Sequence, residues 1–420
     1  MILWRGRWVL GRLRQIPGAL VSGTVWNEVR RKAFLYVGFI ATGVALTIPG
    51  ALLPLLLVRW SMNDARGGLL LFSFYAVGSF GSYYARGRMN WSVARGAVLT
   101  VLGAICLGWA GRWTAYGAIA IYGLGLSLTM TSISLLLSQR FPERRRLELT
   151  RLNLVWAIGA ALGPWVALRS TRGAATTHAA AVLHAQHVLI GVAIFFAAAA
   201  VWSVVIEASP LASMTERAGA ASKRHESQGT RVPWTLLVLI FGATGVDAAA
   251  GGWLTSYAQR AGDSLGITIG AATFLWLGSL LSRIVHSTRW ASRLPERIVL
   301  GSSMLAMTAA LALLLAWPAG IVTMVAAAVL GLAAGPVYPL VIAAALRHRE
   351  NSTVFAVAGV GASILPLLTG ALSNWTHSLR AGLGVPLLAA AVMAVLVAVS
   401  GGALQGKREP VAEALIGEAG

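Results

Sequence analysis

The chain has 420 residues, of which 57% are hydrophobic and only 11% are charged, with a formal net charge of +20. A soluble domain carries roughly 25% charged residues, so the composition excludes an ordinary soluble protein. The basic residues are spread over short loops and form no single patch, which argues against a nucleic-acid partner. The single cysteine, Cys106, excludes a disulfide framework and a cysteine metal site.

Residues 1–32 form a basic segment that also contains tryptophan. Its arginines interrupt any apolar core, and no small-residue cleavage site follows, so the segment does not have the pattern of a secretory signal. We expect it to lie at the membrane surface, where tryptophan rings anchor among the lipid headgroups.

Twelve apolar runs follow, each close to the 20 residues that a helix needs to cross a hydrocarbon layer ~30 Å thick. We expect transmembrane helices near residues 33–57, 67–86, 93–111, 115–138, 150–168, 186–206, 233–257, 267–285, 298–316, 320–346, 352–373 and 381–402.

The longest polar interruption, residues 207–232, divides these runs into two sets of six. The first half is residues 33–206, the second is 233–402, and 403–420 is a polar tail. The run from Gly159 to Pro164 recurs as Gly361 to Pro366, both of the form G-A-x-x-x-P, in corresponding helices of the two halves. The sequence therefore predicts an all-α membrane protein whose twelve transmembrane helices form two parallel-repeat six-helix bundles.

The distribution of positive charge predicts the orientation of the chain. Of the 34 Lys and Arg residues, 27 fall on the side that carries the two termini and the central loop. Cytoplasmic loops are enriched in these residues. We therefore expect a multi-pass protein of the inner membrane with both termini in the cytoplasm.

Asp247 is the one acidic residue inside an apolar run. Counted from Pro233 at ~1.5 Å per residue, it lies about 21 Å into a layer ~30 Å thick. A charge at that depth costs about 2.5–3.5 kcal/mol on insertion scales, so the carboxyl needs a proton, water or a partner. Asp247 either couples transport to protons or contacts substrate, or it is a neutral, hydrogen-bonded group that ties two helices together.

The residues after Asp247 extend this candidate site. Gly251 and Gly252 either unwind the helix beside a cavity or allow another helix to pack closely. Trp253 and Tyr257 either stack on a solute or anchor the helix at the membrane surface.

Four residues on other helices complete the candidate substrate site. Tyr338 lies between two prolines that should kink its helix, and Asn153 and Trp156 share one helix face. Trp276 is a further aromatic candidate. For each of these, ordinary helix packing is the alternative.

No motif for ATP binding or for enzyme catalysis is present, so we expect neither an enzyme nor a cofactor. His178, His184 and His187 cluster in one loop, but no carboxylate or thiol lies near them in the sequence, so no metal site is predicted.

Several of these motifs resemble those of major facilitator superfamily transporters. The run Gly81-Ser-Tyr-Tyr-Ala-Arg-Gly-Arg88 is similar to the family's cytoplasmic G-x-x-x-D-R-x-G-R signature, with Ala85 in place of the acid. Glycines 159 and 163 with Pro164 resemble its glycine-rich helix motif, and Gly361 and Pro366 repeat this helix-packing motif in the second half. The stretch from Gly245 to Tyr257 and the run Gly335-Pro-Val-Tyr-Pro339 are similar to the fucose-permease-like, sugar-transporting branch.

The resemblance covers residues 33–402 and implies a transporter that works by alternating access, with Gly81, Arg86, Arg88 and Arg283 at a cytoplasmic gate. We predict a secondary transporter of a small polar solute such as a monosaccharide, with protons coupled through Asp247. Two alternatives stay open: a proton-driven exporter of amphipathic or cationic compounds, and a membrane sensor that binds solute without moving it. The expected partners are the solute, lipids and protons, and the expected state is a monomer.

Overall fold

The computed structural model describes residues 18–85, 89–141, 145–170, 178–207, 232–261, 265–286, 294–317, 320–346 and 352–400. Over these residues the chain is helical and contains no strand, which confirms the all-α prediction. The helices are α2 (Gly18–Arg59), α3 (Asp64–Tyr84), α4 (Met89–Trp109), α5 (Thr114–Arg140), α6 (Arg145–Ser170), α7 (His178–Glu207), α9 (Trp234–Arg260), α10 (Leu265–His286), α11 (Glu296–Ala316), α12 (Ile321–Leu346), α13 (Ser352–Thr376), α14 (Leu379–Gly382) and α15 (Gly384–Val399).

Each predicted span corresponds to one of these helices, with three differences. Helix α7 begins at His178, eight residues before the predicted span 186–206, so His178, His184 and His187 are on a helix and not in the predicted loop. Helix α2 begins at Gly18, so it continues into the segment 1–32 that the sequence analysis treated as separate; residues 1–17 lie outside the described residues. The last span is divided into α14 and α15 at Leu383. The central linker, apart from its two ends, and the tail 403–420 also lie outside the described residues.

Eleven of the described spans are long and apolar enough to cross a membrane by length and composition. Helix α3 is as long as α4 but less apolar, because it begins with Asp64 and carries several hydroxyl side chains. It packs against α5 on one side and α13 on the other. Protein neighbours on both sides reduce its contact with lipid, which explains why a less apolar sequence is tolerated there.

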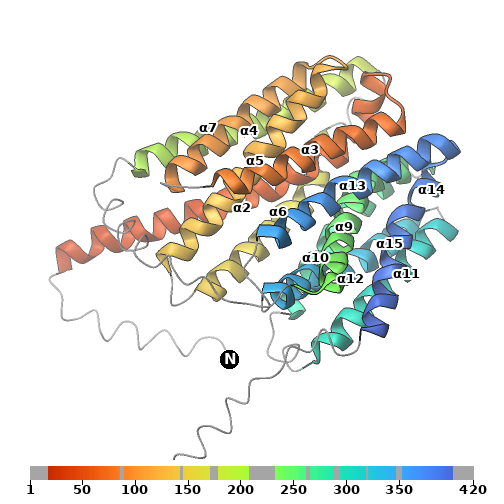
Figure 1. The fold of residues 1–420 in the computed structure, drawn as a ribbon. Coiled ribbons are helices and arrows are strands. Elements are labelled where there is room, and N and C mark those ends of the chain that lie inside the picture. Colours follow the sequence, from red (N-terminus) through yellow and green to blue (C-terminus); the bar gives the residue numbers. More distant parts are fainter. Residues whose placement is uncertain are drawn as a thin grey trace, which may run out of the picture.

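The helices form two bundles, α2–α7 and α9–α15, which lie one above the other in Figure 1. The bundles meet through three helix pairs: α2 with α9, α3 with α13, and α6 with α10. Helix α5 packs mainly within the first bundle, and α12 within the second. We call the side at which α2, α6 and α9 begin the basic face, and the other side the opposite face.

Glycines set the closest helix contacts inside each bundle. A Cβ on Gly159 would overlap the carbonyl oxygen of Ile40, so α6 lies directly against the backbone of α2. In the second bundle, a Cβ on Gly361 would overlap the carbonyl oxygen of Phe241, which brings α13 against α9. Small residues allow such close approach where no hydrophobic effect drives helices together in lipid. The motif repeated in the two halves is therefore used for the same contact in both.

Gly163 extends the α2–α6 contact by one turn, since a Cβ there would overlap Oγ1 of Thr47. Pro164 and Pro366 follow within α6 and α13, and both helices continue through them.

Gly159→Ala tests this packing. The added methyl group forces α2 and α6 apart, and overpacking of this kind costs about 1–3 kcal/mol. We expect a lower thermal unfolding temperature in detergent. Gly117→Ala is the matched control, because a Cβ on Gly117 meets nothing within 4 Å. Equal unfolding temperatures for Gly159→Ala and the control would contradict the assigned contact.

Candidate functional site

Six side chains from both bundles form a group at the boundary between them, which we call the central cluster. Ring contacts and electrostatic interactions connect its members, which are Tyr75 on α3, Trp156 on α6, Asp247 on α9, Trp276 and Arg283 on α10, and Tyr338 on α12.

Asp247 lies at the middle of α9 and is partly exposed, so solvent-accessible space reaches it. Its carboxylate interacts electrostatically with Arg283 and with Tyr75, which faces it from the first bundle. Among the described residues, no hydrogen bond and no ion pair within 4.0 Å holds this carboxylate. Asp247 is therefore available to water, a proton or a ligand.

Arg283 brings a positive charge to the same place. Its guanidinium carbon lies 5.1 Å from the centre of the Trp156 ring, a cation–π arrangement. Its Nε is buried and has no hydrogen-bond acceptor among the described residues. The sequence analysis grouped Arg283 with a gate at the membrane surface, whereas the structure directs its long side chain inward to the central cluster.

Two tryptophans from different bundles meet beside this arginine. The rings of Trp156 and Trp276 lie 5.8 Å apart, centre to centre, at an interplanar angle of 87°. The indole Nε1 of Trp156 is buried and has no acceptor among the described residues. Both tryptophans were candidates from sequence, and the structure brings them together with Asp247 and Arg283.

Tyr338, on α12, is partly buried and interacts electrostatically with Arg283. Helix α12 stays continuous through Pro336 and Pro339. Asn153, which shares a helix with Trp156, is exposed, while Trp156 is only 7% exposed. Tyr338 therefore belongs to the central cluster, and Asn153 does not.

Of the two alternatives for Gly251 and Gly252, the structure agrees with close helix packing, because α9 is helical throughout Trp234–Arg260 and does not unwind there. A Cβ on Gly50 of α2 would overlap the carbonyl oxygen of Gly251, and a Cβ on Gly252 would lie 2.7 Å from Leu71. These glycines thus serve close packing across the boundary between the bundles. Their backbone is not free to bind a solute.

Trp253 and Tyr257, expected from sequence to contact a solute or the membrane surface, are packed inside the protein. Trp253 is fully buried, and its indole N–H donates to the carbonyl of Pro366 at 3.0 Å. The Tyr257 hydroxyl donates to the carbonyl of Leu314 at 2.7 Å. Polar groups at the depth of the lipid hydrocarbon need such hydrogen-bond partners. Both side chains therefore serve packing inside the protein.

An ion pair that could not be foreseen from the sequence joins the two bundles toward the opposite face. Arg260 of α9 donates from Nη1 and Nη2 to the two carboxylate oxygens of Asp64 on α3, each at 2.6 Å. Ser373 of α13 donates a third bond to Asp64 at 2.5 Å. These bonds join the first bundle to two helices of the second. In the sequence, Asp64 and Arg260 are opposite charges at the ends of two spans that are far apart along the chain, and nothing there indicates that they pair.

A second carboxylate is paired near the basic face, within the first bundle. Glu148 on α6 is 2% exposed and accepts bonds from Lys32 at 2.7 Å and from Tyr36 at 2.5 Å, both on α2. Arg151 lies 3.2 Å from the same carboxylate. This network adds a polar connection to the glycine contact between α2 and α6.

The predicted gate motif is only partly covered. Arg86 and Arg88 lie outside the described residues. A Cβ on Gly81 would lie 2.6 Å from the carbonyl oxygen of Leu124, so Gly81 packs α3 against α5.

No group of three or more potential metal ligands occurs among the described residues. The rings of His184 and His187 lie 6.0 Å apart on α7, and the side chain of His178 is outside the described part of the chain.

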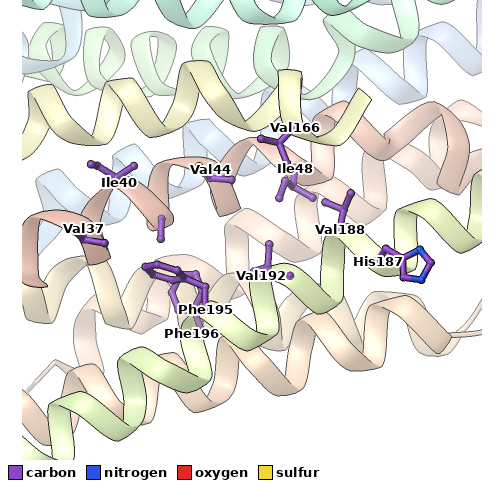
Figure 2. Close-up of a pocket in the computed structure, with 12 residues that line it drawn as sticks. Val37, Ile40, Val44, Ile48, Val166, His187, Val188, Val192, Phe195 and Phe196 are labelled. Carbon is purple, nitrogen blue, oxygen red and sulfur yellow. The ribbon is translucent and has the colours of Figure 1, made fainter. Parts of the chain in front are cut away.

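A groove with a volume of about 430 Å³ lies between α2, α6 and α7, away from the central cluster. Figure 2 shows aliphatic and phenylalanine side chains around it, with His187 at one end. A polar solute would find almost no hydrogen-bonding partners there, so this groove is not a candidate for the solute site.

Asp64→Asn tests whether the Asp64–Arg260 pair holds the opposite face closed. Loss of the charge weakens all three bonds, and we expect the bundles to separate there more often. The reporter is Ser256→Cys in a Cys106→Ser background. Ser256 is fully buried and is one turn from Gly252, on the side of α9 that faces α3. A membrane-impermeant maleimide should label it several-fold faster from the opposite face in the Asp64→Asn protein.

Glu148→Gln is the matched control, because it removes a buried carboxylate of a network that lies within one bundle. Labelling from the opposite face should not change in this variant. An unchanged rate with Asp64→Asn would show that the ion pair does not control closure.

A family profile described as Major Facilitator Superfamily matches residues 35–353. No curated protein matches the sequence.

Solved structures are similar to the chain over nearly its whole length. A variant of the E. coli fucose:proton symporter FucP is 17% identical, with 88% of this chain and 98% of that chain covered and a TM-score of 0.56. A bacterial homologue of the human lysosomal transporter Spinster, in an inward-facing and occupied conformation, is 13% identical, with 89% and 97% covered and a TM-score of 0.66. The nucleoside transporter NupG is 14% identical, with 90% and 99% covered and a TM-score of 0.63. At these identities the likeness shows the fold, which confirms the predicted arrangement of twelve helices.

Proposed function

The chain belongs to the major facilitator superfamily, and from this premise we propose that it moves a small polar solute past the central cluster by alternating access. It is a multi-pass membrane transporter and not an enzyme. One observation carries the proposal: a carboxylate and a guanidinium, both partly exposed and neither in a direct ion pair among the described residues, lie where the two bundles meet. Charged groups at membrane depth mark substrate and ion pathways.

We propose that the structure represents the state closed at the opposite face and open toward the basic face. Support comes from the Asp64–Arg260 pair and from the contact of Gly50 with Gly251, which both join the bundles toward the opposite face. Helices α5 and α12 pack mainly within their own bundles. The similar Spinster homologue is itself described as inward-facing.

The basic face is proposed to be cytoplasmic, in an inner membrane, because 27 of the 34 Lys and Arg residues belong to that side. A monomer is proposed as well, since one chain supplies every member of the central cluster.

Asp247 is proposed to couple transport to protons. The neutral acid is favoured when the site is closed to water, and the charged form when it is open. Exchange between these forms lets one carboxyl accept a proton on one side of the membrane and release it on the other.

A sugar remains the first candidate by resemblance, and FucP is described as a fucose:proton symporter. Export of cationic compounds is less well supported, because Arg283 lies beside Asp247 and would repel a cation.

Reconstitution in liposomes tests the function. Solute uptake is measured with and without an imposed pH gradient, for the wild type and for Asp247→Asn. We expect the gradient to drive accumulation in the wild type. Accumulation should fall by about tenfold or more in the variant, while exchange of solute at equal pH persists.

Asp263→Asn, the same substitution in the connection between α9 and α10, is the control and should behave as the wild type. Flux that ignores both the gradient and Asp247 would remove the coupling role. Saturable solute binding without any flux would favour a sensor over a transporter.

A further inference from the structure

The central cluster offers an excess of hydrogen-bond donors. The Nε of Arg283 and the Nε1 of Trp156 are buried N–H groups without an acceptor among the described residues. Guanidinium and indole groups can donate hydrogen bonds but cannot accept them. A buried donor without a partner is unfavourable, so these two groups are suited to a ligand that brings acceptor oxygens.

The two donors are held in a fixed relation to each other. The Arg283 guanidinium lies over the face of the Trp156 ring at 5.1 Å, and the unpaired N–H belongs to the edge of that same ring. An acceptor group that bonds to the side of the guanidinium nearest the edge of this ring therefore lies close to the indole N–H. A carboxylate has two oxygens and can accept from both.

The charge of the cluster limits the ligand further. Asp247 interacts electrostatically with Arg283 but makes no ion pair with it within 4.0 Å in the described part of the chain. The positive charge is thus balanced from a distance, while the Arg283 guanidinium donates no hydrogen bond within the described ranges. A single guanidinium matches a single negative charge, whereas a dianion would bring excess negative charge to a site that already contains a carboxylate.

Aromatic surface adjoins the donors. Trp276 lies edge-on to Trp156. Because Gly251 has no side chain, the Trp276 ring can approach α9; a Cβ on Gly251 would lie 2.9 Å from that ring. This arrangement provides an apolar contact next to a cationic, donor-rich one. The matching solute has a compact apolar body and one anionic end.

We propose that the central cluster binds a small monocarboxylate, with its carboxylate on Arg283 and the Trp156 N–H and its apolar body against Trp276. The assignment rests on the proposed function only in taking the central cluster as the solute site. It replaces the neutral sugar with an organic monoanion as the class of substrate.

Asp247 then determines when Arg283 is available. Its ionised form attracts the guanidinium, and its protonated form leaves the positive charge to the ligand, so proton and monoanion bind together. Besides Asp247 and Arg283 themselves, Tyr75 on α3 and Tyr338 on α12 are the titratable groups that face this pair. The described parts of α13 and α15, which also pack on α9, contain no titratable side chain, and the titratable groups described on α2 lie toward the two ends of its membrane-spanning part, Arg30–Arg59.

Ligands that share a phenyl ring and differ in the charge of their polar end test the assignment: benzoate, benzamide and benzylammonium. Binding to the purified full-length protein in nanodiscs is measured by calorimetry at two pH values. We expect benzoate to bind at least tenfold more tightly than benzamide and benzylammonium to bind weakest. Benzoate should bind more tightly at the lower pH, and this pH dependence should disappear in Asp247→Asn.

Variants then assign the contact. Arg283→Gln should lose at least tenfold in benzoate affinity, Arg283→Lys should retain part of it, and Trp156→Phe should lose several-fold because it keeps a ring but removes the N–H. Arg169→Gln is the matched control, since Arg169 also lies over a tryptophan, Trp165, at 5.8 Å, but is exposed and far from the cluster. Thermal unfolding of each variant separates loss of binding from loss of folding.

Benzamide or a monosaccharide binding as tightly as benzoate would overturn the assignment, as would full benzoate affinity in a folded Arg283→Gln protein. A different outcome would contradict the proposed function. If benzoate binds through Arg283 but no flux is measured in liposomes, the monocarboxylate site is supported and transport is contradicted. Proton-driven sugar flux that is independent of Arg283 would retain transport and remove the monocarboxylate.

Discussion

Charges inside a membrane protein need partners, because the hydrocarbon layer supplies no water to solvate them. Three acidic side chains in the described part of the chain differ in how they meet this requirement. Asp64 and Glu148 are each bonded directly to a base and to a hydroxyl group. Asp247 has a base nearby but makes no direct bond to it in the described part of the chain. The paired acids join helices, and Asp247, which has no direct bond among the described residues, is the acid to which we assign proton coupling.

The position of each acid fits this division. Glu148 joins α2 to α6 within one bundle, so its network can persist while the bundles move. Asp64 joins α3 to α9 and α13, so its bonds must break when the opposite face opens. Asp247 lies between these levels, at the boundary of the bundles. Glycine contacts such as Gly50 with Gly251 hold the backbones of the two bundles close together at this boundary.

The helices and the fold could be predicted from the sequence because the hydrocarbon layer imposes a length and a composition on each span. Asp247 could be found for the same reason, as an acid in an apolar run. The partners across the bundles could not, because spacing along one helix does not show which distant helix faces it. From sequence, Trp253 and Tyr257 were thus expected to contact either a solute or the membrane surface, whereas each bonds to a carbonyl of another helix. Arg283 looked like a surface charge, since its position near the end of α10 does not reveal where so long a side chain points.

The way Asp64 is bonded has a kinetic consequence. One carboxylate accepts from α9 and α13 together, so complete separation of the bundles at the opposite face requires all three bonds to break. Arg260 is 46% exposed, and ions in the adjacent solution screen such a pair. We therefore expect a higher ionic strength on that one side of the membrane to shorten the time that the protein dwells before each opening.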